Sequence, residues 1–221
     1  MLTKQELAKI IDHTLVKPNA TKDEIVRVCE EAKKYVFGAV CVNPFYVKLV
    51  ANALKGTNIK VCSTVGFPFG SNSSEVKALE AKKAIENGAK ELDMVMNIGA
   101  FKSKDYELVK QDIVAVVEIA KKFNVIVKVI IECCYLTDEE KIKACLIAKE
   151  AKADYIKTST GFGPSGAKVS DIKLIKSFVG ESMGIKASGG IRTISQVLEM
   201  INAGATRIGT SSGVQIIEGL K

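Results

Sequence analysis

The feature that most constrains the fold of this chain is a regular alternation of short apolar segments with amphipathic segments. Eight segments have the composition and length of β-strands: 11–15, 38–43, 60–66, 91–97, 126–132, 154–160, 184–189 and 206–211. Segments with helical periodicity lie between them. Strands that alternate with helices form a parallel sheet through right-handed crossovers. Eight such units in 221 residues predict an α/β protein, a single-domain (β/α)8 TIM barrel over residues 1–221.

Several helix starts are marked by two residues three positions apart, in which each side chain can cap the backbone N–H of the other. These capping pairs are Thr21 with Glu24, Asn72 with Glu75, Thr137 with Glu140 and Thr193 with Gln196. Each pair predicts a helix that begins directly after its first residue.

Composition indicates a globular protein of a reducing compartment. Hydrophobic residues make up 47% of the chain, and no apolar run approaches the roughly 20 residues that cross a bilayer. The first fifteen residues carry charges throughout and lack the apolar core of a signal peptide, so we expect a cytoplasmic protein. The six cysteines contain no C-x-x-C pair and the chain has one histidine, so we expect no metal site.

The net charge of +7 raises the question of a nucleic-acid partner. The lysines alternate with glutamates at helical spacing, as in 30–34 and 80–91, and few aromatic residues lie among them. This pattern is typical of solvated helix faces. We therefore expect neither nucleic acid nor a membrane as a partner.

The predicted barrel also indicates where its chemistry lies, because active sites of this fold lie at the carboxyl ends of the strands. Polar residues collect at these ends: Asn43, Asn97, Glu132, Ser159, Ser188 and Ser211. Three strands also carry charges within them. Alternation of side chains places Asp93, Lys157 and Lys186 on the inward faces, opposite apolar residues that face the helices.

These three charges have a structural interpretation and a catalytic one. They could form a buried ion-pair network, or the register could be wrong by one residue and the lysines solvated. Burying two ammonium groups against one carboxylate is unfavourable, and burial and a neighbouring cation both favour the neutral amine. A neutral lysine attacks carbonyl groups and forms a Schiff base, with a nearby carboxylate to move protons. This reasoning is symmetric between Lys157 and Lys186 and does not decide which of them attacks.

Glycine-rich segments follow the last two predicted strands. Ser188-Gly189-Gly190 and 209–213 both lead into predicted helices, at the usual phosphate site of this fold. The segment 161–166, GFGPSG, also matches G-x-G-x-x-G. It follows the sixth strand, not the first, and Pro164 removes an N–H that a pyrophosphate would need. We therefore expect no dinucleotide cofactor.

Several of these motifs together resemble one enzyme family. They are IDHTLVKP at 11–18, CVNPFYV at 41–47, STVGFPFG at 63–70, ELDMVMNIGA at 91–100, KTSTGFG at 157–163, KASGGIRT at 186–193 and GTSSG at 209–213. The chain resembles deoxyribose-phosphate aldolase over nearly its whole length. The resemblance implies a class I aldolase that needs neither a metal nor an organic cofactor. It would cleave 2-deoxy-D-ribose 5-phosphate reversibly to D-glyceraldehyde 3-phosphate and acetaldehyde, and act as a homo-oligomer, a dimer or a tetramer.

The resemblance also implies roles for particular residues. Lys157 matches the Schiff-base lysine, Lys186 the second lysine that tunes its reactivity, and Asp93 the aspartate that acts as acid and base through a water. The implied phosphate-binding positions are Gly161, Gly189, Gly190, Gly209, Ser211 and Ser212, and the implied substrate-side polar residues are Asp12 and Thr14. His13 alternates away from them, and we expect it to be structural.

The chain departs from the family pattern at two places. Some members carry a lysine where this chain has Phe162, and some end in a tyrosine, whereas this sequence ends in EGLK. Two other functions stay open from the sequence. One is a sugar-phosphate isomerase that uses Asp93 without imine chemistry, and the other is a non-catalytic basic binding protein.

Overall fold

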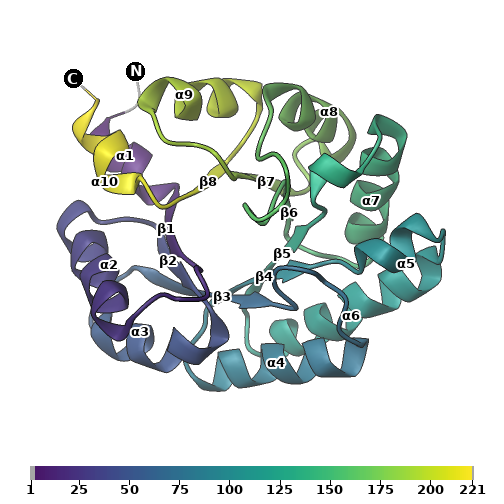
Figure 1. The fold of residues 1–221 in the computed structure, drawn as a ribbon, viewed down its shortest axis with the longest axis horizontal. Coiled ribbons are helices and arrows are strands. Elements are labelled where there is room, and N and C mark those ends of the chain that lie inside the picture. Colours follow the sequence, from purple (N-terminus) through teal and green to yellow (C-terminus); the bar gives the residue numbers. More distant parts are fainter. Residues whose placement is uncertain (1–2, 221) are drawn as a thin grey trace.

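The computed structural model describes residues 3–220, and they form a closed barrel of parallel strands inside a ring of helices (Figure 1). The strands are β1 (Ile11–Leu15), β2 (Ala39–Val42), β3 (Lys60–Val65), β4 (Glu91–Val95), β5 (Ile126–Ile130), β6 (Tyr155–Lys157), β7 (Gly184–Ser188) and β8 (Arg207–Thr210). The predicted (β/α)8 barrel is confirmed. Residues 1, 2 and 221 lie outside the described residues. All three belong to the expected domain, and residues 1 and 2 also belong to the N-terminal stretch discussed above.

Helices follow the strands and cover the outside of the barrel. They are α1 (Lys4–Lys9), α2 (Lys22–Tyr35), α3 (Val47–Ala53), α4 (Ser74–Glu86), α5 (Ile98–Lys102), α6 (Tyr106–Lys122), α7 (Asp138–Glu150), α8 (Val169–Val179), α9 (Ile194–Ala203) and α10 (Gly213–Glu218). Short 3₁₀ turns, Pro44–Tyr46 and Cys133–Tyr135, follow β2 and β5. Among the residues that the structure describes, no helix combines the length and the apolar character that crossing a bilayer requires.

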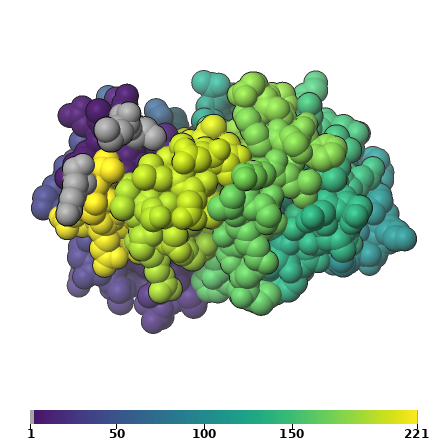
Figure 2. Space-filling view, turned by 90° about the horizontal axis from the view of Figure 1, so that it is seen from above, coloured from purple at the N-terminus to yellow at the C-terminus, as the bar shows by residue number. Residues whose placement is uncertain are grey.

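The barrel closes where the two ends of the chain meet. β1 pairs with β8 in parallel, with Asp12 opposite Gly209. Figure 2 shows the yellow C-terminal segment against the purple N-terminal one, in agreement with this pairing. The closure brings the residues of the first strand beside the glycine-rich loop after the last.

Alternation along the strands separates two environments. Leu92, Met94 and Ile156 are buried in the apolar layer between the strands and the helices. Their neighbours Asp93 and Lys157 face the barrel interior, where they are buried among charged side chains. The predicted register is therefore correct.

Helix starts follow the predicted capping pairs with one exception. Reciprocal capping boxes are present at the start of α2, α7 and α9. The pair Asn72 with Glu75 is wrong, because α4 begins at Ser74 with Ser73 at the N-cap. The first helical bond there runs from the Lys77 N–H to the Ser73 carbonyl, which places Asn72 one residue outside the helix.

The carboxyl end of β4 is connected to the outer helices by a buried ion pair. Lys77 on α4 is fully buried, and its Nζ lies 2.6 Å from Asp112 Oδ2 on α6. The same Nζ donates to the Val95 carbonyl at the end of β4, at 2.9 Å. Lys77 therefore connects both helices to the strand that carries Asp93.

Removal of one partner of this pair leaves a buried charge without compensation. We expect Lys77→Met to lower the free energy of unfolding by about 3 kcal/mol, because the Asp112 carboxylate stays buried. The double variant Lys77→Met/Asp112→Leu should recover part of that loss. Urea unfolding measures both values, and a double variant less stable than Lys77→Met would contradict this interpretation.

Candidate active site

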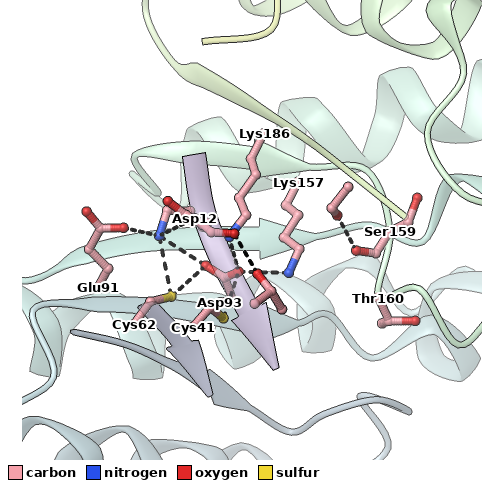
Figure 3. Close-up of polar contacts among 12 residues, drawn as sticks. Asp12, Cys41, Cys62, Glu91, Asp93, Lys157, Ser159, Thr160 and Lys186 are labelled. Carbon is pink, nitrogen blue, oxygen red and sulfur yellow. Dashed lines mark hydrogen bonds and ion pairs between the residues drawn. The ribbon is translucent and has the colours of Figure 1, made fainter. Parts of the chain in front are cut away.

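Asp93 is the centre of a cluster of charged side chains inside the barrel (Figure 3). Lys157 Nζ on β6 and Lys186 Nζ on β7 both lie 2.7 Å from the same atom, Asp93 Oδ2. Asp93 and Lys186 are fully buried, and Lys157 is 4% exposed. The structure thus brings together the three charges that the sequence placed on the inward faces.

The cluster extends further toward the amino ends of the strands. Lys128 Nζ on β5 lies 3.1 Å from Asp93 Oδ1 and also contacts Glu91. Arg207 donates to Asp12 Oδ1 and to Glu91 Oε1, at 2.9 Å each. Sequence reasoning missed Lys128, Glu91 and Arg207 as members of the interior cluster. For Lys128 a signal was present, because it alternates with Val127 and Val129 as Lys157 does with its own neighbours.

The expected charge balance was therefore wrong. Three carboxylates (Asp12, Glu91 and Asp93) contact four cationic side chains (Lys128, Lys157, Lys186 and Arg207). The two lysines share Asp93, but it is not the only carboxylate of the interior, because Lys186 also contacts Asp12. With all seven groups ionised, one positive charge is still in excess.

The interior charges shift each other's pKa values. Burial would raise the pKa of Asp93, but the ammonium groups of Lys128, Lys157 and Lys186 outweigh it and hold that pKa well below its usual value. Burial would lower the pKa of Lys186, but the carboxylates of Asp12 and Asp93 outweigh it and raise that pKa. Lys128 is shifted upward in the same way. The expectation that burial would release the proton is therefore wrong for Lys186, which stays an ammonium.

Geometry separates the two lysines that the charge reasoning from the sequence left equivalent. Lys157 lines a cavity of about 370 Å³ at the carboxyl ends of the strands. Lys186 does not line it, because its amine is directed at Asp12 and Asp93 inside the barrel. Lys157 is consequently the amine that a molecule in the cavity would meet.

The same cavity collects most of the implied substrate residues. Its lining includes Thr14, Gly161, Gly189, Gly190, Gly209 and Ser211. Asp12 and Ser212 are not part of the lining. Asp12 is fully buried below the cavity as a partner of Lys186 and Arg207, and the Ser212 N–H donates to Thr210 Oγ1 at 2.9 Å.

Two glycine-rich loops form one wall of the cavity by packing against each other. A Cβ atom at Gly166 would lie 2.0 Å from the Gly189 carbonyl oxygen, so only glycine fits there. The Ala167 N–H donates to the carbonyls of Ser188 and Gly189, at 3.0 and 3.1 Å. The last glycine of GFGPSG therefore serves loop packing, which explains the motif without a nucleotide.

Two cationic side chains in the cavity lining were not assigned from the sequence. Lys17 follows β1 and Arg192 follows β7, and both line the cavity with the glycine-rich loops. Phe162 also lines it and packs edge-on against Phe67, with ring centroids 5.4 Å apart. The cavity thus has positive charge near its glycines although it has Phe162 where some family members have lysine.

His13 faces away from this site. Its Nε2 lies 2.6 Å from Glu31 Oε2 on α2, and its ring packs against Phe37. Burial, more than this carboxylate, controls the pKa of His13 and lowers it. The contacts agree with the structural role expected for His13.

The Lys128 ammonium group contacts the side chains of the interior that could otherwise bind a metal ion. Two groups place ligand atoms within 4.8 Å of one another: Cys41, Cys62 and Asp93, and Asp12, Cys62 and Glu91. Lys128 Nζ lies 3.6 Å from Cys62 Sγ and contacts Asp93 and Glu91 as well. Its positive charge opposes a metal cation at either group.

Comparison with known proteins shows the family of this chain. A sequence model described as DeoC/LacD family aldolase matches residues 7–219. The chain belongs to this aldolase family. It is 59% identical to a deoxyribose-phosphate aldolase of Thermococcus kodakarensis, across 99% of this chain and 98% of the relative. It is 58% identical to one of Clostridium tetani, across 96% and 98%.

Solved structures show the same architecture. The deoxyribose phosphate aldolase of Aeropyrum pernix superposes with a TM-score of 0.92 at 34% identity, over 98% of this chain and 91% of that chain. An aldolase named QR15 gives a TM-score of 0.92 at 43% identity, over 96% and 95%. The barrel of this aldolase is therefore the fold of its family.

The buried carboxylates make the stability of this aldolase dependent on acid pH. The pKa of Asp93 is lower in the folded protein than in the unfolded chain, where it is about 3.9. Its stabilising contribution is therefore present above about pH 5 and is lost as the pH falls toward the folded pKa. We expect the free energy of unfolding in urea to decrease from pH 5 to pH 3 by less in Asp93→Asn than in the wild type. Equal decreases in the two proteins would contradict this assignment.

Proposed function

We propose that this chain is a deoxyribose-phosphate aldolase that cleaves 2-deoxy-D-ribose 5-phosphate to D-glyceraldehyde 3-phosphate and acetaldehyde through a Schiff base on Lys157. The observation that carries the proposal is the position of Lys157, whose amine contacts Asp93 on one side and a glycine-lined cavity on the other. Relatives of this name match nearly the whole chain. We propose further that residues 1–221 act as one aldolase domain.

The first half of the reaction forms the imine. The neutral amine of Lys157 attacks the C1 aldehyde of the open-chain sugar, and the resulting carbinolamine loses water to give an iminium. Protons must move between nitrogen, oxygen and solvent in these steps. Asp93 is the carboxylate that contacts Lys157 Nζ, and we assign it this transfer, with a water extending its reach. Lys186 remains a cation beside Asp93, because the carboxylates of Asp12 and Asp93 raise its pKa.

The second half breaks the carbon–carbon bond. The iminium at C1 accepts the electron pair of the C2–C3 bond as the C3 hydroxyl loses its proton, so that D-glyceraldehyde 3-phosphate leaves and an enamine remains on Lys157. Protonation of the enamine at C2 restores the iminium, and water then releases acetaldehyde and the free lysine. These steps use only the amine, proton transfer through Asp93 and water.

We propose that the phosphate end of the substrate binds at the glycine-rich lining of the cavity. Gly161, Gly189, Gly190, Gly209 and Ser211 line it, and glycines allow backbone N–H groups to approach an anion closely. We propose that Lys17 and Arg192 supply the positive charge there. Asp12 is assigned to holding Lys186 in place, while Ser212 remains a predicted phosphate residue outside the cavity lining.

Reductive trapping tests the nucleophile and the reaction class together. With acetaldehyde and borohydride, we expect a reduced two-carbon adduct on Lys157, located by peptide mass spectrometry. Lys157→Met should lose both the adduct and aldolase activity, because among residues 3–220 no other lysine both lines the cavity and contacts Asp93. An adduct confined to Lys186 would contradict the assigned roles, and retained activity in Lys157→Met would favour isomerase chemistry without an imine.

Charge removal tests the phosphate end. We expect Lys17→Gln and Arg192→Gln each to raise KM for 2-deoxyribose 5-phosphate about tenfold, since each loses a charge-assisted contact with the phosphate. Unphosphorylated 2-deoxyribose is the matched control substrate, and its kcat/KM should change much less. Equal losses for both substrates would show that these side chains do not act on the phosphate.

We also propose that the chain self-associates into a dimer or a tetramer in the cytoplasm. The Aeropyrum pernix relative is tetrameric, and α4 exposes Val76 and Leu79 while it buries Ala81 and Ala84. The cysteines of the described residues are all free thiols, which suits a reducing compartment. Light scattering should give an oligomer mass that decreases in Leu79→Glu, and a monomeric wild type would refute self-association.

A further inference from the structure

Glu132 is a buried carboxylate outside the ion-pair cluster, and the proposed reaction does not use it. It follows β5, is 2% exposed, and adopts a left-handed backbone conformation with φ 51° and ψ 67°. A non-glycine residue in this region carries backbone strain. Among the described residues, no lysine, arginine or histidine lies within ion-pair distance of it. A strained, buried and unpaired carboxylate calls for a specific reason.

Thr160 binds this carboxylate through both its N–H and its hydroxyl group. The Thr160 N–H lies 3.2 Å from both Glu132 Oε1 and Oε2, and Thr160 Oγ1 donates to Oε2. Thr160 Oγ1 in turn accepts from the Phe162 N–H at 3.0 Å. Because an ionised carboxylate only accepts, it forces the hydroxyl to donate toward Glu132 and to accept from Phe162.

These bonds fix the turn that contains Gly161. Gly161 lies between the two residues that the hydroxyl connects, with φ +87°, and it lines the cavity. Within residues 3–220 its N–H donates to no backbone acceptor, and a Cβ at this position would have no atom within 4 Å. Thr160 lies three residues after Lys157, and both residues line the same cavity as Gly161.

The loop also packs closely against Glu132 from the other side. A Cβ at Gly163 would lie 2.7 Å from Cys134 Sγ and 3.4 Å from Glu132 Cδ. The turn is therefore fixed by the carboxylate below Thr160 and by close packing at Gly163. A buried anion near a phosphate site is electrostatically unfavourable, so packing alone does not account for a glutamate at this position.

We propose that Glu132 is a positioning residue that orients the Gly161 N–H toward the phosphate, and thereby sets the preference for phosphorylated over unphosphorylated substrates. This inference rests on the proposed phosphate site. Glu132 does not itself contact the substrate, since it acts through the Thr160 hydroxyl and the turn that this hydroxyl closes.

The test is the ratio of kcat/KM for 2-deoxyribose 5-phosphate to that for 2-deoxyribose in Glu132→Gln. The amide keeps the size of the side chain but replaces one acceptor oxygen by an NH2 donor. This donor cannot accept the hydrogen bonds that the Thr160 N–H and hydroxyl donate to the carboxylate. We expect the ratio to decrease about tenfold, the effect of one lost hydrogen bond to a charged group, with most of the change in KM for the phosphorylated sugar. A purely structural role would reduce activity toward both sugars equally, and that result would overturn the proposal.

Thr160 provides a second, independent pair of variants. Thr160→Val removes the hydroxyl and should decrease the ratio as Glu132→Gln does, whereas Thr160→Ser keeps the hydroxyl and should retain the wild-type ratio. If Glu132→Gln does not fold, this pair decides, and an unchanged ratio in Thr160→Val overturns the proposal.

Lys17→Gln and Arg192→Gln separate this proposal from the phosphate site on which it depends. If they decrease the ratio and neither Glu132→Gln nor Thr160→Val does, the phosphate site stands and the role of Glu132 is wrong. If none of these variants changes the ratio, the proposed phosphate site is wrong, and so is the positioning role of Glu132 that depends on it.

Discussion

The contact on which the rest of this site depends is the sharing of one carboxylate oxygen, Asp93 Oδ2, by the ammonium groups of Lys157 and Lys186. One carboxylate cannot neutralise two cations, so the additional partners of each lysine decide its behaviour. Lys186 has a second acid in Asp12 and keeps its proton. Lys157 has Asp93 alone among the described carboxylates and reaches the cavity. The difference between the two lysines arises from their surroundings and not from their sequence context.

Three parts of the barrel surround this contact: the outward faces of the strands, their inward faces and the loops at their carboxyl ends. The outward faces pack an apolar layer that fixes the strands, with Lys77 connecting β4 to two helices. The inward faces hold the charges in a buried interior, where Lys128 and Arg207 contact the carboxylates. The loops at the carboxyl ends carry the glycines and the cations Lys17 and Arg192. The Lys157 amine and the proposed phosphate site therefore share one cavity, and neither lies in the apolar layer that packs the barrel.

Much of this arrangement could be predicted from the sequence, and the misses have physical causes. Strand alternation was sufficient to place Asp93, Lys157 and Lys186 inside, because an apolar residue precedes each of them in its strand. Glu91 and Arg207 are the first residues of their strands, where a charged side chain can turn either inward or to solvent. The left-handed backbone of Glu132 is invisible in a sequence, since it depends on the bonds to Thr160. The helix start at Ser74 differs by one residue from the capping pattern because Asn72 and Ser73 both suit an N-cap.

The central claim is that Lys186 stays a cation and leaves Lys157 as the reactive amine. The most direct test is ¹⁵N NMR of the lysine side chains, with the Lys186 signal identified by its absence in Lys186→Met. The ¹⁵N shift and the attached protons distinguish an ammonium group from a neutral amine. The account predicts an ammonium at Lys186 throughout the range from about pH 6 to about pH 10. This whole range lies below the ordinary lysine pKa of about 10.4. Loss of the Lys186 proton within that range would contradict it.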